Sequence, residues 1–141
     1  MHVVIETSRG NIAFRMQDKE APNTCENFVK LAKKGFYDNL TWHRVIDNFV
    51  VQGGCPKGDG TGGPGYTIAA ELSERPHVKG TVAMARGSAL DSAGSQFYIA
   101  RTTLPHLDKK YTVFGQMTSG FDVLDKIKQG DAIKKISVVE E

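Results

Sequence analysis

Short strand-like segments separated by turn residues constrain the fold of this chain more than any other feature of its sequence. Glycine alone supplies 15 of the 141 residues, and it recurs between short runs rich in β-branched and aromatic side chains. Such runs are typical of β-strands, and many of them with only two helical segments indicate an antiparallel barrel or sandwich. The expected strands are residues 2–7, 12–16, the two arms of a hairpin in 41–54, 81–85, 95–100, 112–117 and 132–139.

Two segments have the spacing of amphipathic helices. The first is predicted to begin at Pro22, because proline fits the first helical position, and to end at Gly35. The second covers residues 121–130 and is expected to end at Gly130. The apolar positions are Cys25, Phe28, Val29, Ala32 and Phe36 in the first, and Phe121, Val123, Leu124 and Ile127 in the second.

The length and composition suit one soluble domain over residues 1–141, which we expect to be a monomer. Hydrophobic residues make up 40% of the chain, and no apolar run approaches the length of a membrane span. The formal net charge is only +2, so nothing indicates binding to nucleic acid or to an anionic membrane.

The amino-terminal residues and the cysteines indicate a cytoplasmic location. The first ten residues enter a strand-like pattern at once, without the basic and apolar regions of a secretory signal. The two cysteines are too few for a disulfide framework. Cys25 lies on the apolar stripe of the first helix and is expected to be a buried core thiol, whereas Cys55 is expected to be more exposed.

Common catalytic and ligand-binding motifs are absent or lack their context. GDGTGG, residues 58–63, matches the dinucleotide-binding pattern, but no helical pattern follows it, so we interpret residues 53–65 as a glycine-rich loop. The chain has no P-loop, no nucleophile elbow and no carboxylate pair of the glycosidase type. Its four histidines show no zinc spacing. We therefore expect no metal and no cofactor.

Polar side chains in an otherwise apolar hairpin are the first sign of a site. TWHRVIDNFVVQGG, residues 41–54, reads as two strands joined by a tight turn at Asp47-Asn48. Arg44 lies in the first arm and Gln52 in the second. Because burying an unpaired polar group is costly, these side chains either face solvent or belong to a site.

Several segments of the chain resemble motifs of the cyclophilin family, in family order and with family spacing. The resemblance covers about residues 3–139, and the compact chain is most similar to bacterial-type members. The first segment is similar to the family's aromatic-His-Arg-Val-Ile signature and its Gln-Gly-Gly. The matching segments are WHRVIDNFVVQGG (42–54), GTVAMAR (80–86), SAGSQFYIA (92–100), PHLDKKYTVFGQM (105–117) and FDVLDKIKQGD (121–131).

The resemblance implies a mainly β fold, a closed eight-stranded antiparallel β-barrel capped by two α-helices, with the substrate site on the outside of its wall. It also implies a peptidyl-prolyl cis-trans isomerase that acts without a cofactor and assists protein folding. By the same resemblance, the catalytic residues are Arg44, Phe49 and Gln52, and the substrate-binding residues are Val50, Ala85, Arg86, Gln96, Tyr98, His106, Leu107 and Tyr111.

Two residues within the motifs are assigned structural roles. Strand alternation sends Phe97 to the face opposite Gln96 and Tyr98, so Phe97 is expected in the core. His43 is expected to orient the loop at Arg86 rather than to donate a proton.

Four positions depart from the commonest family pattern. Val50 replaces a methionine, Tyr98 a phenylalanine, His106 a tryptophan and Tyr111 a histidine. The hydroxyl of Tyr98 needs water or a partner. Since the family's tryptophan contacts cyclosporin, weak cyclosporin binding is expected here.

Proline-containing peptides and unfolded or folding proteins are the expected partners. A non-catalytic module that binds proline peptides is the alternative, but such a module has little need of Arg44. A barrel that carries a small ligand is the third interpretation, and nothing in the sequence indicates a wide lumen with a polar mouth.

Overall fold

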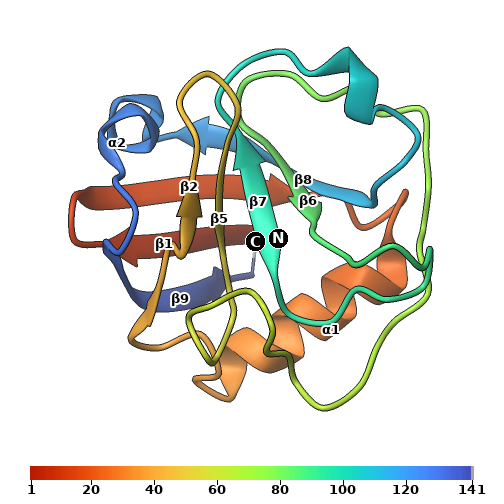
Figure 1. Cartoon of the computed structure of the whole chain (residues 1–141), viewed down its shortest axis with the longest axis horizontal. Helices are drawn as coiled ribbons and strands as arrows, with labels where there is room; N and C mark the ends of the chain where they lie inside the picture. The colour runs from red at the N-terminus through yellow and green to blue at the C-terminus, as the bar shows by residue number, and fades with distance from the viewer. Residues whose placement is uncertain (141) are drawn as a thin grey trace.

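The computed structural model describes residues 1–140, which form nine strands, two α-helices and one short 3-10 helix (Figure 1). All pairings between the strands are antiparallel. The strands are β1 (His2–Thr7), β2 (Gly10–Met16), β3 (Leu40–Thr41), β4 (Arg44–Val45), β5 (Val50–Gly53), β6 (Thr81–Met84), β7 (Phe97–Ala100), β8 (Val113–Ser119) and β9 (Ala132–Val139). The helices are α1 (Pro22–Lys33), η1 (Pro105–Leu107) and α2 (Phe121–Lys126).

The short strands β3 and β4 join the two ends of a single sheet. The strand order is β3-β9-β1-β2-β8-β6-β7-β5-β4, so β3 and β4 are its edges although only two residues separate them in the chain. Between them, Trp42 donates its backbone N–H to Asp131 and accepts that of Gly130, both at 2.9 Å. The sheet thus curls back onto one interrupted strand, and counting β3 and β4 as one gives the predicted eight. The predicted antiparallel β architecture with two α-helices is confirmed.

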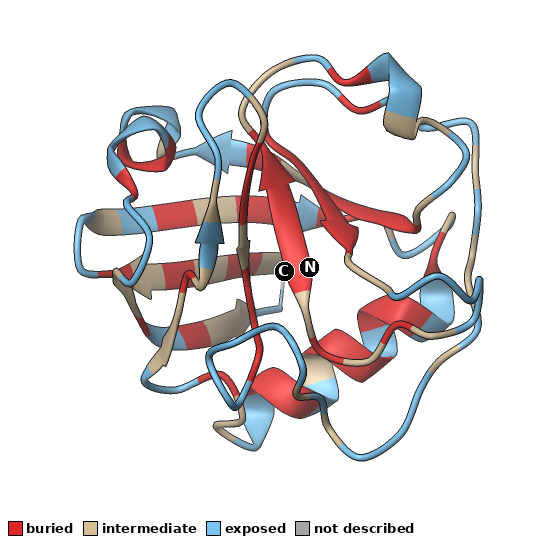
Figure 2. Cartoon of the chain, in the orientation of Figure 1, coloured by how far each residue is buried: buried red, intermediate tan, exposed pale blue. Residues whose placement is uncertain are grey.

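Strands β5, β6 and β7 bury residues on both of their faces (Figure 2). One face joins the main core, which includes Val51, Val82, Phe97 and Ile99. The opposite face carries a second apolar cluster, called here the outer cluster: Val50, Ala83, Tyr98, Ala100, Leu104 and Val113, with Phe49, Leu107 and Tyr111 packed against it. Phe97 is fully buried in the main core, as its place in the alternation predicts.

Aromatic side chains dominate the main core, and α1 contributes its central ring. The ring of Phe28 lies 5.1–5.8 Å, centroid to centroid, from those of Phe14, Tyr37, Phe97 and Phe114. These rings come from α1, β2, β7, β8 and the segment after α1, so Phe28 ties the helix to both halves of the sheet. Cys25 is also buried here, and burial raises the pKa of its thiol to about 12. The prediction of a core thiol is confirmed.

Helix α1 begins at Pro22 as predicted, and its first N–H groups receive a distant partner. Asn23 and Thr24 donate their backbone N–H groups to the carboxylate of Glu71, at 3.2 and 2.7 Å. The helix ends at Lys33, just before Gly35, whose φ of +76° suits glycine.

Helix α2 ends at Lys126, earlier than the predicted Gly130, because Ile127 is extended. At this end the guanidinium of Arg101 binds the carbonyls of Leu124 and Ile127 at 2.9 and 2.6 Å. No helix within residues 1–140 has the length and apolar character needed to cross a membrane.

The glycine-rich loop folds over Cys55, so the expectation that this thiol is exposed is wrong. Cys55 has no exposed surface, and its Sγ accepts the backbone N–H of Gly62 at 3.2 Å. Neighbouring backbone N–H groups of the loop lower the pKa of the thiol against the opposing effect of burial. The loop therefore closes on this sulfur instead of leaving it in solvent.

Replacing Phe28 with alanine should cost about 3–5 kcal/mol of unfolding free energy, because the cavity lies among four packed rings. Urea unfolding followed by Trp42 fluorescence measures this loss. Leu72→Ala is the control: Leu72 is 44% exposed, and its loss should cost under about 1 kcal/mol. Equal losses in the two variants would contradict the central place of Phe28.

Candidate active site

Strand register brings the polar and apolar site residues into one row on the outer face. Arg44 of β4 pairs with Gln52 of β5, Gln52 with Tyr98 of β7, and Tyr98 with Ala83 of β6. Residues opposite each other in neighbouring strands point to the same side, so Arg44, Gln52 and Tyr98 share a face. Val50 and Gln96, two positions along their chains from Gln52 and Tyr98, extend the same face.

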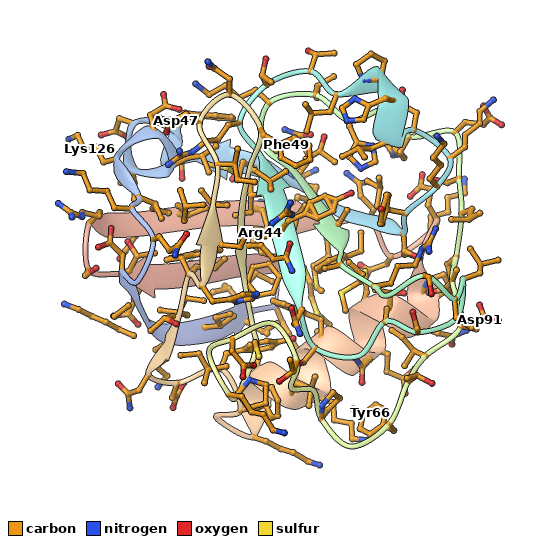
Figure 3. The ribbon with its side chains drawn as sticks, viewed as in Figure 1. Arg44, Asp47, Phe49, Tyr66, Asp91 and Lys126 are labelled. Carbon is orange, nitrogen blue, oxygen red and sulfur yellow. The ribbon has the colours of Figure 1, made fainter. Side chains whose placement is uncertain are left out.

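A pocket of about 190 Å³ lies on this face, over the outer cluster. Its apolar walls come from the hairpin, from β7 and from the segment around η1. Arg44 and Phe49, which both line it, are labelled in Figure 3. The Arg44 guanidinium carbon lies 5.8 Å from the centre of the Phe49 ring. The residues that line the pocket were all predicted as site residues: Arg44, Phe49, Val50, Gln52, Ala85, Arg86, Tyr98, Leu107 and Tyr111.

Two glutamines connect Arg44 to the glycine-rich loop. Arg44 Nη1 donates to Gln52 Oε1 at 3.4 Å, and Gln52 Nε2 donates to Gln96 Oε1 at 3.1 Å. Gln96 Nε2 in turn donates to the carbonyls of Gly60 and Gly62, both at 2.9 Å. This chain of amides sets the side chain of Gln52 so that its oxygen faces the guanidinium. Arg44 and Gln52 thus both line a pocket, and Arg44 is also exposed to solvent at its edge.

A second, larger hollow of about 510 Å³ adjoins the first on the far side of the glutamines. Its walls are residues 60–67, which begin within the glycine-rich loop and run just past it, and the segment 85–96. Gln52, Ala85 and Arg86 line both hollows and form the ridge between them. Arg86 is the single charged side chain among the residues that line the larger hollow.

The rim of the smaller pocket is built from stacked rings and one cation. His106 is exposed and stacks on Phe49, with 6.0 Å between ring centres. Arg86 lies 4.8 Å above the Tyr111 ring and donates Nη2 to the carbonyl of Lys110 at 2.8 Å. These contacts fasten the segment after η1 to the end of β6. Thus His106 lies at the rim, whereas Gln96 lies in the larger hollow.

The hydroxyl of Tyr98 has a buried partner that the sequence did not reveal. It lies 2.7 Å from Nε2 of His77, whose Nδ1 lies 3.0 Å from Oδ1 of Asp108. The His77 side chain has no exposed surface, and burial lowers its pKa despite the carboxylate. Hydrogen bonds from His77 lower the pKa of Asp108, which is therefore ionised. The requirement of Tyr98 for a partner was the only sequence signal for this contact.

His43 does not hold the loop at Arg86 through a hydrogen bond, because neither of its ring nitrogens has a partner within residues 1–140. The ring lies against the glycine-rich loop instead, since a Cβ added to Gly60 would lie 3.7 Å from Nε2 of His43. The guanidinium of Arg86 itself holds that loop, because its Nη1 donates to the carbonyl of Gly87 at 3.0 Å. His43 is neutral at physiological pH, because burial lowers its pKa.

No three His, Cys, Asp or Glu side chains within residues 1–140 gather as a metal site would require. The candidate site instead consists of a guanidinium, two amides and an apolar pocket on the outer wall of a barrel.

Comparison with known proteins decides the family. The family model for cyclophilin-type peptidyl-prolyl cis-trans isomerases matches residues 2–140. The chain belongs to the cyclophilin family. Its activity is therefore peptidyl-prolyl cis-trans isomerisation, as the sequence resemblance predicted.

Bacterial relatives of this cyclophilin carry the same activity in their names. A peptidyl-prolyl cis-trans isomerase of Helicobacter pylori is 51% identical over 139 residues, which is 96% of this chain and 85% of the relative. Peptidyl-prolyl cis-trans isomerase B of Bacillus subtilis is 49% identical over 129 residues, or 90% of each chain.

A solved structure has the same fold. A cyclophilin-type isomerase of Cryptosporidium parvum, crystallised in the presence of the dipeptide Ala-Pro, superposes with a TM-score of 0.93. It is 31% identical, and the match covers 100% of both chains.

The unfolding free energy of this cyclophilin should fall between pH 7 and pH 5. His43 and His77 have lowered pKa values in the folded protein, whereas the unfolded chain protonates near pH 6.5. Their contribution is therefore complete above about pH 6.5 and is lost as the pH falls toward the folded values, by at most about 1.4 kcal/mol per pH unit for each histidine.

Urea unfolding at half-unit pH steps measures this decline. Carboxylates contribute mainly below about pH 5, so the window isolates the histidines. His43→Asn should make the decline shallower. A flat profile from pH 7 to pH 5 would show that the two rings take up protons equally in the folded and unfolded states.

Proposed function

We propose that the 190 Å³ pocket receives the proline ring of the substrate and that Arg44 stabilises the twisted amide. The carrying observation is the position of Arg44: it stands beside an apolar pocket, and no carboxylate within residues 1–140 forms an ion pair with it. Its charge is therefore available to a ligand. The Ala-Pro dipeptide with which the Cryptosporidium relative was crystallised has the same chemistry as the proposed occupant.

The reaction needs positioning and electrostatics and no covalent step. Rotation about an X-Pro bond passes a barrier of about 18–20 kcal/mol, because the planar amide is conjugated. In the twisted amide the nitrogen lone pair is free and accepts a hydrogen bond. Arg44, a planar and permanently charged donor, meets that lone pair and so binds the twisted form better than either planar form.

The remaining site residues hold the two ends of the reacting bond. Phe49, Val50, Tyr98 and Leu107 give apolar area to the ring, while Gln52 orients Arg44 and the substrate backbone. Ala85 and Arg86, which directly follow β6 and line the pocket, lie where they can contact the peptide backbone. The fixed pocket holds the proline while Arg44 acts on its nitrogen, and the preceding carbonyl turns.

The wider role follows from this chemistry. We expect this cyclophilin to act on folding and unfolded chains as a cytoplasmic monomer without a cofactor. Light scattering measures the oligomeric state, and activity after chelation tests the cofactor requirement. The alternative raised by the sequence, a module that binds proline peptides without turnover, would bind a model peptide but would not speed its isomerisation.

Arg44→Ala should lower kcat/KM by roughly 10²–10³-fold, because a charge-assisted hydrogen bond to the twisted amide is lost. A coupled proline-isomerisation assay on a model peptide measures this. Arg15→Ala, at an exposed arginine of β2, is the matched control and should keep full activity. The Arg44→Ala protein should stay folded, since Arg44 is exposed. Near-normal turnover in that folded variant would remove Arg44 from the mechanism.

His106→Trp should tighten cyclosporin binding by about 1–3 kcal/mol, the effect of an added aromatic face and an indole donor. Because His106 already stacks on Phe49, a tryptophan there meets the same rim. Titration calorimetry at pH 7.5 on both proteins gives the difference, and turnover of small peptides should change much less. Equal affinities would show that Val50 and Tyr98 limit binding instead.

A further inference from the structure

His77 lies outside every motif that identified the site, yet it contacts two walls of the smaller pocket. It precedes β6, where its side chain is fully buried. One wall is Tyr98 on β7. The other is the rim segment, defined here as residues 104–111, which contains η1 and supplies Leu107 and Tyr111 to the pocket.

His77 binds the rim segment at two places. Its backbone carbonyl accepts the N–H of Leu104 at 2.9 Å. Its backbone N–H and its Nδ1 lie 2.7 and 3.0 Å from the same Asp108 oxygen. His77 thus binds both ends of the segment from Leu104 to Asp108, and Leu107 lies between these two ends.

The ring of His77 also contacts the wall of the pocket that Tyr98 forms. An ionised carboxylate only accepts hydrogen bonds, so Asp108 sets the proton of His77 on Nδ1. Nε2 is then an acceptor, and the Tyr98 hydroxyl donates to it at 2.7 Å. Tyr98 is 4% exposed, and its ring meets that of Tyr111 edge-on at 5.8 Å between centres. The hydroxyl therefore points away from the pocket, while the ring remains part of its wall.

We propose that His77 is a positioning residue for the proline pocket, holding Tyr98 and the rim segment at a fixed separation through hydrogen bonds on both sides of its ring. The proposal rests on the assignment of the 190 Å³ pocket to proline. A residue that only shapes a pocket contributes equally to the ground and transition states, so its loss raises KM and leaves kcat nearly unchanged. A merely structural histidine would lower the melting temperature and change neither constant.

The first test uses His77→Asn and Tyr98→Phe, alone and together. The asparagine amide is placed to bind Asp108, but it does not reach Tyr98. Each single variant should raise KM for an Ala-Pro peptide by about three- to tenfold, the effect of one buried hydrogen bond, with kcat within about twofold. Because both changes break the same contact, the double variant should resemble a single one. An unchanged KM, or single effects that multiply, would overturn the proposal.

Tyr37→Phe is the matched control. The Tyr37 hydroxyl is also buried and donates to the carbonyl of Ser95 at 2.9 Å, but Tyr37 does not line the smaller pocket. Its loss should lower the melting temperature and leave KM unchanged.

A second pair of variants tests the proposal without altering the buried ring. Asp108 is partly exposed, so Asp108→Ala should fold, and it removes the acceptor of both His77 donors. We expect a raised KM that is not additive with Tyr98→Phe, and partial rescue by Asp108→Asn, which keeps an acceptor oxygen. Additive effects, or no rescue, would show that the two walls are not coupled through His77.

Arg44→Ala in the same assay separates this proposal from the proposed function. If Arg44→Ala lowers kcat while the His77 and Asp108 variants leave KM unchanged, the positioning role fails and the mechanism stands. If the His77 and Asp108 variants raise KM while Arg44→Ala keeps its kcat, the mechanism fails and the positioning role stands.

Discussion

The antiparallel pairing of β5 with β7 is the constraint on which the rest of the structure depends. It sets Gln52 opposite Tyr98, so that the site residues face outward while Val51 and Phe97 face the core. A slip of one residue would exchange these two faces. Gly54 helps to hold the register where β5 ends: its φ is +90°, and a Cβ there would lie 2.5 Å from the carbonyl oxygen of Ser95. No other residue type permits this approach.

The site gains its rigidity from side chains that tie strands to loops. On one side, Gln52 and Gln96 connect Arg44 to carbonyls of the glycine-rich loop. On the other, Arg86 holds the carbonyl of Lys110, and His77 joins Tyr98 to Asp108. In the mechanism proposed here isomerisation needs no covalent intermediate, so its rate would depend on how well the pocket and the guanidinium are held in place.

Much of the candidate site could be predicted because the residues that line its pocket lie in contiguous motifs. Nine of the predicted residues line a single pocket, because neighbouring strands place Arg44, Gln52 and Tyr98 side by side. His77 was missed because its partners are 21 and 31 residues away in the chain. Cys55 and His43 were misplaced for a related reason: both depend on how the glycine-rich loop folds back, which its composition does not specify.

The sequence by itself determined the local features: the alternation of the strands, the apolar stripe of α1, and the turn in which Asn48 has a φ of +56°. These depend on neighbouring residues and on the conformations that each residue type allows. Only the tertiary structure decided the closure of the sheet at β3 and β4, the end of α2 at the guanidinium of Arg101, and the partner of the Tyr98 hydroxyl. Each of these is a contact between groups far apart in the chain, and such contacts exist only when the whole barrel has brought those groups together.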